Sequence, residues 1–292
     1  MQPTRVKRRL ATITAATCLS GAALAAPAHA DTTPSGANDW NCKPTAAHPY
    51  PVVLVHGTTA NSALNWATLS PELAKAGYCV FAFDYGMTWV SGGLIGGLSD
   101  IAGSAKTMSA FVDRVLAATG TTKVDVVGHS QGGMMPNYYI KRLGGAAKVH
   151  TLIGLAPSNH GTTVNGLIDL VRAAGLLGRI AGFYNLLGFP AFIQQTAGSD
   201  FQKALFADGD TVPGVRYAVI ETRHDIVVTP YTNAFLHGGD VTNVLLQDQC
   251  PGDPVGHAGL AFDSPAHQNV LNLLGPDIPG FKATCTGYGP AL

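Results

Sequence analysis

Charged side chains are scarce, since Asp, Glu, Lys and Arg together make up only 12% of the 292 residues. No basic run follows Arg9, so nothing in the sequence indicates a nucleic-acid partner. Only five cysteines are present, without the Cys-x-x-Cys or histidine–cysteine spacing of zinc sites. The chain also lacks internal repeats and a clear domain linker. These absences predict one large domain that binds neither zinc nor nucleic acid.

The first thirty residues have the three parts of a secretory signal peptide. A basic start is followed by an apolar stretch of small residues over 10–26 and by an Ala-x-Ala cleavage site at 28–30. That stretch is short and interrupted by threonine and serine, which argues against a membrane anchor. Cys18 follows a poor match to a lipidation box. We therefore predict that residues 1–30 are removed, and that the mature chain is secreted and extracellular, with no stable membrane anchor.

Four cysteines remain after this processing: Cys42, Cys79, Cys250 and Cys285. An even number in an exported chain favours two disulfides, and four cysteines allow three pairings. The first two lie near the first two predicted strands, and the other two lie in the C-terminal quarter. We expect near neighbours to pair, as Cys42–Cys79 and Cys250–Cys285.

Apolar, β-branched runs alternate with helical patterns along the chain. The runs span 52–56, 80–84, 124–127, 151–155, 215–221 and 241–247. This order predicts an α/β fold, in which helices cover both faces of a mostly parallel sheet. Helices are expected to begin at Ser70, Ser99 and Ser264. Residues 31–292 are expected to form a single domain.

Residues 162–196 do not fit this plain alternation. Their few charges accompany leucine, valine and alanine at helical spacing, and glycines interrupt the pattern. One interpretation is a core helix followed by a glycine-rich loop. The other, which we favour, is a mobile apolar lid that would expose an apolar face at a lipid surface. The glycine-rich stretch 86–99 is expected to form the opposite wall.

The most informative motif is Gly128-His129-Ser130-Gln131-Gly132. A β-branched run precedes it, and a helical pattern over 134–144 follows. Strand, Gly-x-Ser-x-Gly turn and helix together form the nucleophile elbow of α/β-hydrolases, which exposes the serine hydroxyl above the sheet. Ser130 is therefore the predicted nucleophile.

A serine nucleophile needs a base, usually a histidine that a carboxylate orients. In this fold the chain order is serine, acid, histidine. Asp225 follows the predicted strand 215–221 and is the expected acid, ahead of other loop aspartates. His257 lies in a turn between the last strand and the last helix, where the base belongs. His267 is its main rival. The remaining downstream histidines are less suitably placed: His150, His160, His224 and His237.

An oxyanion hole requires preorganised donors. The N–H of Gln131, at the start of the helix after the nucleophile, is one candidate. The second is the N–H of Thr58, in the loop after the first strand, with its hydroxyl as a further donor. His56 and His129 are interpreted as structural.

Longer phrases resemble one known family. They are Val55-His56-Gly57-Thr58, Gly128 to Pro136, Asn159-His160-Gly161-Thr162, Gln194 to Asp200, Asp225 to Tyr231 and Leu246 to Pro251. They resemble the secreted bacterial class 2 lipases of the α/β-hydrolase superfamily, over nearly all the mature chain. The resemblance implies an α/β-hydrolase fold and a carboxylic ester hydrolase that acts on acylglycerols. By position it implies Ser130, Asp225 and His257 as the triad, with Thr58 and Gln131 at the oxyanion hole.

The expected partner is a lipid or ester substrate, reached by a monomer and without a cofactor. Some bacterial lipases bind calcium near the histidine, but no matching acidic pair is evident, so no metal is predicted. Cutin, other polyesters or short soluble esters are alternative substrates, and acyl transfer to an alcohol is an alternative reaction. A catalytically inactive secreted binding protein is the alternative from another class.

Overall fold

The computed structural model describes residues 33–276, 278 and 280–292. The predicted signal peptide and its cleavage site lie outside the described residues. Within the described part of the chain, no helix is both long enough and apolar enough to cross a membrane.

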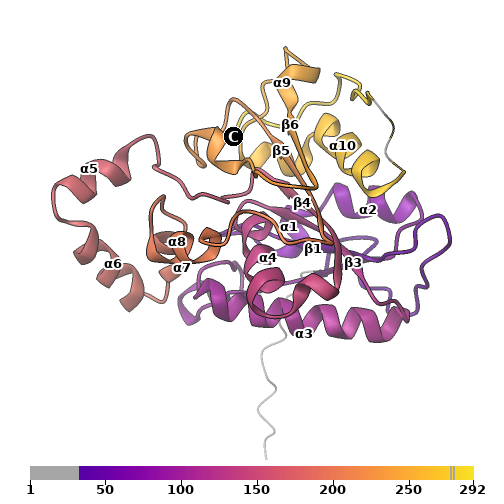
Figure 1. The fold of residues 1–292 in the computed structure, drawn as a ribbon, viewed down its shortest axis with the longest axis horizontal. Coiled ribbons are helices and arrows are strands. Elements are labelled where there is room, and N and C mark those ends of the chain that lie inside the picture. Colours follow the sequence, from indigo (N-terminus) through magenta and orange to yellow (C-terminus); the bar gives the residue numbers. More distant parts are fainter. Residues whose placement is uncertain (1–32, 277, 279) are drawn as a thin grey trace, which may run out of the picture. The chain divides into compact units, whose positions relative to one another are not determined.

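Six parallel strands form one sheet in the order β2-β1-β3-β4-β5-β6 (Figure 1). The strands are β1 (Val52–Val55), β2 (Val80–Phe83), β3 (Val124–His129), β4 (Val149–Leu155), β5 (Arg216–Glu221) and β6 (Val241–Leu245). Nearly every residue of the first five strands is buried, because helices cover both faces. All six predicted strands are confirmed. The last two residues of the predicted final strand instead belong to helix α9.

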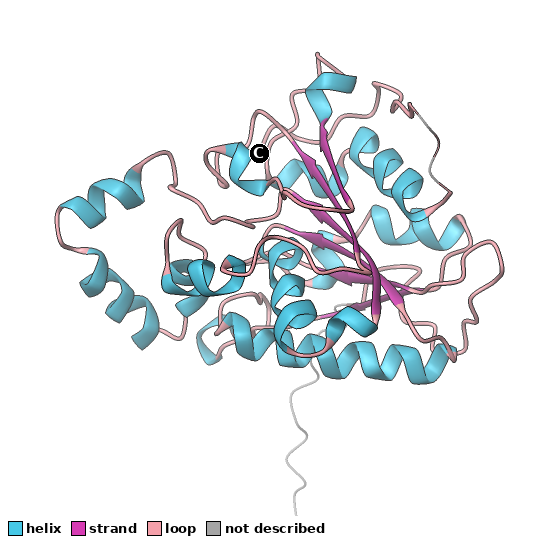
Figure 2. Ribbon diagram, in the orientation of Figure 1, coloured by secondary structure: helices cyan, strands magenta, loops and turns pink. Residues whose placement is uncertain are grey.

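Helices flank this sheet on both sides (Figure 2). Those of the described residues are α1 (Ser62–Asn65), α2 (Leu69–Lys75), α3 (Ile101–Thr119), α4 (Gln131–Arg142), α5 (Leu167–Ala173), α6 (Leu177–Leu186), α7 (Pro190–Gln194), α8 (Asp200–Phe206), α9 (Leu246–Gln249) and α10 (Ser264–Leu274). Short 3₁₀ turns are η1 (Trp89–Ser91), η2 (Gly145–Ala147), η3 (Tyr231–Ala234) and η4 (Ala258–Phe262).

Two apolar cores lie on opposite faces of the sheet because side chains alternate along each strand. Val53 and Val55 of β1 pack in one core with apolar residues of α3 and α4. Val52 and Leu54 pack in the other with residues of α2 and α10. The predicted fold, a parallel sheet covered on both faces, is confirmed.

Helix α10 begins at Ser264 as expected, whereas α2 and α3 begin one or two residues away from the expected serines. Helix α3 is capped by Asp100, whose Oδ2 accepts a hydrogen bond from the Gly103 N–H (2.7 Å), and not by Ser99. Helix α10 is capped in the same way by Asp263. Helix α2 begins at Leu69, so Ser70 lies inside it. In α3 and α10, an aspartate carboxylate next to the expected serine accepts the free N–H of the first turn.

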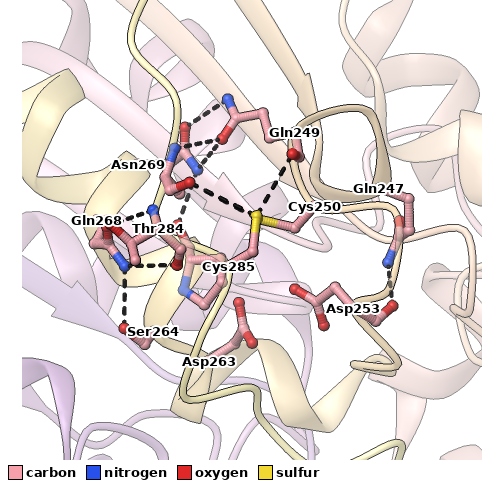
Figure 3. Close-up of a disulfide and its surroundings, with 12 residues drawn as sticks. Gln247, Gln249, Cys250, Asp253, Asp263, Ser264, Gln268, Asn269, Thr284 and Cys285 are labelled. Carbon is pink, nitrogen blue, oxygen red and sulfur yellow. Dashed lines mark hydrogen bonds between the residues drawn. A yellow bond between two sulfur atoms is a disulfide. The ribbon is translucent and has the colours of Figure 1, made fainter.

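The two disulfides join the expected pairs, Cys42–Cys79 and Cys250–Cys285. Figure 3 shows the second disulfide beside the side chains of Gln249 and Asn269. Two reciprocal amide hydrogen bonds join these side chains, at 3.0 and 3.1 Å. Cys285 is therefore held near α10, and the chain leads from it into the C-terminal tail, residues 286–292.

Candidate active site

Ser130 lies at the turn between β3 and α4 with backbone angles φ 55° and ψ −123°. A non-glycine residue at positive φ is strained and persists only where its surroundings enforce it. Two neighbouring glycines permit this tight turn. A Cβ atom on Gly128 would lie 1.9 Å from the Gly132 carbonyl oxygen, and one on Gly132 would lie 2.1 Å from the Val55 oxygen. The glycines of the motif thus let β3, α4 and the end of β1 meet closely beneath Ser130.

Asp225 and His257 come from different loops and form a direct hydrogen bond. The His257 Nδ1 atom lies 2.7 Å from Asp225 Oδ2. The other carboxylate oxygen, Oδ1, accepts the N–H groups of Val227 (2.7 Å) and Val228 (2.8 Å). Both oxygens are therefore held in place. The carboxylate favours the imidazole tautomer protonated at Nδ1, which leaves the Nε2 lone pair available as a base.

The loop that carries His257 is held from two sides. His129 Nε2 lies 3.0 Å from the His257 carbonyl oxygen. Burial lowers the pKa of His129 to about 3, so its ring is neutral near pH 7 and donates this hydrogen bond. On the other side, the N–H groups of Ala258 (2.7 Å) and Gly259 (3.2 Å) donate to the Leu292 carbonyl oxygen. His129 and the C-terminal tail thus position the histidine loop.

The rival histidines bind other partners. His267 contacts the Glu72 carboxylate through Nδ1 (2.9 Å) and the Ala261 carbonyl oxygen through Nε2 (3.1 Å). His150 pairs with Asp125, and His160 pairs with Asp210. The structure therefore brings His257, and not His267, to Asp225.

A cavity of about 790 Å³ opens at this place, and both Ser130 and His257 line it. Most of its remaining wall is apolar, and α5, α6 and the loop after Asp225 contribute three residues each to it. Helices α5 and α6 bury none of their residues fully and extend away from the sheet in Figure 1. Their outward side chains include Leu170, Phe183 and Leu186, which are 68%, 59% and 80% exposed. This segment thus presents one apolar surface to the cavity and another to the outside.

The loop after β1 passes close to the nucleophile. A Cβ atom on Gly57 would lie 3.2 Å from Ser130 Cβ, and the next residue, Thr58, lines the cavity. His56 holds this loop, since its Nδ1 lies 2.8 Å from the Gly57 oxygen and its ring stacks on Tyr85. Burial lowers the pKa of His56, so it is a neutral structural residue.

Gln195 was missed in the sequence interpretation. Its side-chain Nε2 donates to the Thr58 hydroxyl oxygen at 3.0 Å, and Gln131 Nε2 does the same from the first turn of α4. The only sequence signal for Gln195 was its place in the polar phrase Gln194-Gln195-Thr196 at the end of an apolar segment.

No group of three or more histidine, cysteine or acidic side chains is placed to hold a metal ion in the part of the chain that the structure describes. The polar residues that line the cavity instead carry hydroxyl, imidazole and amide groups, and the Asp225 carboxylate is bonded to one of the imidazoles, that of His257. This set of groups suits acyl transfer by a serine nucleophile.

A profile of the family described as lipase (class 2) matches residues 49–257. The chain belongs to the class 2 lipases. It is 38% identical over 100 residues to triacylglycerol lipases of Pseudarthrobacter phenanthrenivorans and Burkholderia plantarii. Each match covers 32% of this chain and only about a quarter of the relative, 28% and 25% respectively.

Solved structures of other lipases share the fold of this class 2 lipase. Lipase B of Aspergillus fumigatus is similar with a TM-score of 0.63 and 20% identity, over 85% of this chain and 57% of that one. The mature lipase BlEst2 of Bacillus licheniformis is similar with a TM-score of 0.57 and 18% identity, over 80% and 94%. At these identities the likeness establishes the α/β-hydrolase fold alone.

Proposed function

We propose that this class 2 lipase is an extracellular enzyme that hydrolyses acylglycerol esters through a Ser130–His257–Asp225 triad. The observation that carries the proposal is the 2.7 Å bond between His257 Nδ1 and Asp225 Oδ2, at a cavity that Ser130 also lines. Ser130 stands in a strained elbow at the end of a parallel strand, as serine nucleophiles of this fold do. Residues 31–292 form the catalytic domain, and its two disulfides fit an oxidising, extracellular setting.

Hydrolysis proceeds in two steps through an acyl-enzyme. His257 Nε2 accepts the hydroxyl proton of Ser130 as Oγ attacks the ester carbonyl carbon, and Asp225 stabilises the resulting imidazolium. The tetrahedral oxyanion is bound by the N–H groups of Thr58 and Gln131. His257 then protonates the leaving alcohol. In the second step His257 removes a proton from water, which attacks the acyl carbon; the bond to Ser130 Oγ breaks, His257 returns the proton to Oγ, and the fatty acid leaves.

The shape of the cavity favours a flexible acyl chain as the substrate. Helices α5 and α6 of the predicted lid form part of its apolar wall, and a long acyl chain would bury its methylene groups there. A short soluble ester would leave much of this wall empty, and a rigid polyester would need the helices to move aside. We therefore expect kcat/KM to rise with acyl length in a series of triacylglycerols and to exceed the activity on dispersed polyester film.

The experiment that tests the triad compares single variants in p-nitrophenyl ester hydrolysis. Ser130→Ala should lower kcat by about six orders of magnitude, and His257→Ala by a similar amount. In Asp225→Asn, the retained oxygen would still accept the two backbone N–H groups, and the amide nitrogen would face His257 Nδ1. That arrangement favours the wrong tautomer, so kcat should fall about 10⁴-fold.

The matched control is His267→Gln, which changes the rival histidine outside the cavity and should keep kcat within a few-fold. Thermal unfolding of each variant separates lost chemistry from lost folding. Activity that survives in Ser130→Ala, or that disappears equally in the two histidine variants while both remain folded, would refute the triad.

A further inference from the structure

Two glutamine side chains meet at the hydroxyl of Thr58. Gln131 Nε2 donates one hydrogen to the Gly97 carbonyl oxygen (2.9 Å) and lies 3.0 Å from Thr58 Oγ1. Gln195 Nε2 donates one hydrogen to the Ala191 carbonyl oxygen (3.2 Å) and also lies 3.0 Å from Thr58 Oγ1. A carbonyl oxygen can only accept, so each contact fixes which end of the amide is nitrogen.

The hydroxyl must therefore accept two hydrogen bonds. Each amide nitrogen carries two hydrogens, and one of each pair is already used on a carbonyl. The second hydrogen of each amide points to Thr58 Oγ1, and a hydroxyl oxygen has only two acceptor sites. Both sites are thus occupied. The hydroxyl proton cannot be directed at either glutamine and remains the one free polar group of this side chain, which lines the cavity beside Ser130.

We propose that Gln195 is a positioning residue, which together with Gln131 orients the Thr58 hydroxyl as a third oxyanion donor. The inference rests on the proposed function, because an oxyanion forms only if Ser130 attacks a carbonyl. Thr58 then gives two donors to the oxyanion, its N–H and its O–H, and the Gln131 N–H gives the other. Donors held in place before the reaction need no reorganisation when charge develops.

Gln195 also links this donor to the segment over the cavity. It is the C-cap residue of α7, at the end of the apolar segment 162–196. Its Oε1 accepts a hydrogen bond from the Ser158 hydroxyl (2.9 Å), and the Ser158 carbonyl oxygen accepts one from Gln202 (3.0 Å). The Gln195 amide is therefore fixed at both ends. A displacement of α7 would withdraw one of the two amides that orient Thr58. The position of this helix therefore influences whether the Thr58 hydroxyl proton is directed into the cavity.

The test is the isosteric change Gln195→Glu. A carboxylate oxygen at the position of Nε2 accepts and cannot donate, so the Thr58 proton would turn from the cavity toward the new carboxylate. We expect kcat for a p-nitrophenyl ester near pH 8 to fall about 10²-fold, the loss typical of one oxyanion donor, with little change in KM. Lowering the pH should restore part of kcat, relative to wild type, as the carboxylate takes up a proton and can donate again.

A double-mutant cycle shows whether Gln195 acts through Thr58. Thr58→Val removes the hydroxyl and keeps the N–H, and we expect it to lower kcat about 10²-fold, while Thr58→Ser restores most of the loss. In the Thr58→Val background, Gln195→Glu should have almost no further effect on kcat. The control Asn185→Asp makes the same amide-to-carboxylate change at an exposed residue of α6 that does not line the cavity, and it should leave kcat unchanged.

An equal loss of kcat from Gln195→Glu in the wild-type and Thr58→Val backgrounds would overturn the inference, as would unchanged kcat in Gln195→Glu or in Thr58→Val. If Gln195→Glu does not fold, the comparison of Thr58→Val with Thr58→Ser still decides whether the hydroxyl acts. Failure of the proposed function would look different, because the wild-type protein itself would then hydrolyse no ester.

Discussion

At the scale of single residues, the site places an unusual carboxyl group beside the proposed catalytic acid. Glu221 ends β5 and is fully buried. Its Oε1 accepts the Thr222 N–H at 2.8 Å, and its Oε2 has no hydrogen-bond partner among the described residues. Burial, together with the nearby charge of Asp225, raises the pKa of Glu221 well above its usual value. The neutral form of Glu221 is thus favoured, so that no second negative charge lies beside the Asp225 carboxylate.

This raised pKa predicts a pH-dependent gain of stability in Glu221→Gln. Between the ordinary pKa of about 4.5 and the raised pKa of the folded protein, Glu221 is ionised in the unfolded chain and protonated in the folded one, so unfolding releases a proton and wild-type stability falls as pH rises. Glutamine keeps the shape and cannot ionise. Within this pH range, the free energy of unfolding of the variant should rise relative to that of wild type by up to about 1.4 kcal/mol per pH unit. Urea unfolding at pH 5, 6, 7 and 8 measures the difference, and a constant difference would contradict the assignment.

At the scale of elements, the elbow requires glycine, whereas the helices over the cavity have room for alanine in its place. Gly132→Ala would place a Cβ 2.1 Å from the Val55 carbonyl oxygen, and the backbone atoms around it prevent relief. At Gly182, in the middle of α6, an added Cβ would have no other atom within 4 Å, so alanine there fits and favours the helix by about 0.5–1 kcal/mol.

We therefore expect Gly132→Ala to lose several kcal/mol of stability or to be recovered only as insoluble protein. The added Cβ would clash with backbone atoms, which cannot move aside as a flexible side chain can. The matched control Gly182→Ala should fold normally and retain ester hydrolysis. Soluble expression and thermal unfolding of both variants check this. A Gly132→Ala protein that unfolds at the wild-type temperature would contradict the elbow geometry.

Elements with a strong local signal were predictable from the sequence. The strands followed from β-branched apolar runs, and the elbow followed from a Gly-x-Ser-x-Gly turn between a strand and a helix. Helix starts were wrong where an aspartate took the capping position beside the expected serine, as at Asp100. The contact of Gln195 with Thr58 could not be foreseen, because 137 residues separate them and no local pattern links a polar residue after α7 to the loop after β1.

At the scale of the whole molecule, the C-terminal tail and one disulfide support the histidine loop. Cys285 is bonded to Cys250, and the tail that follows accepts N–H groups of Gly256, Ala258 and Gly259. A Cβ on Gly259 would lie 1.9 Å from the Pro290 carbonyl oxygen, so the tail packs directly on this loop. The position of His257 thus depends on chain segments that lie apart in sequence.

Replacing both Cys250 and Cys285 by alanine should therefore affect stability and activity together. A 35-residue separation predicts a loss of about 3–4 kcal/mol from the greater freedom of the unfolded chain. Because the tail would be less restrained, kcat should also fall at temperatures where the variant is still folded. The control replaces Cys42 and Cys79, whose separation of 37 residues is similar and which lie outside the histidine loop. Equal effects of the two pairs on kcat would contradict a role of the tail.

The central claim is that Ser130, activated by His257, attacks a carbonyl carbon, and covalent trapping tests it most directly. A p-nitrophenyl alkylphosphonate presents phosphorus to the nucleophile; Ser130 Oγ bonds to phosphorus, p-nitrophenolate leaves, and His257 takes the hydroxyl proton. We predict one p-nitrophenolate released per protein molecule, one phosphonate mass added, and the adduct located on Ser130 by peptide mass spectrometry. His257→Ala should react far more slowly. An adduct on another residue, or no adduct on protein that still hydrolyses esters, would contradict the account.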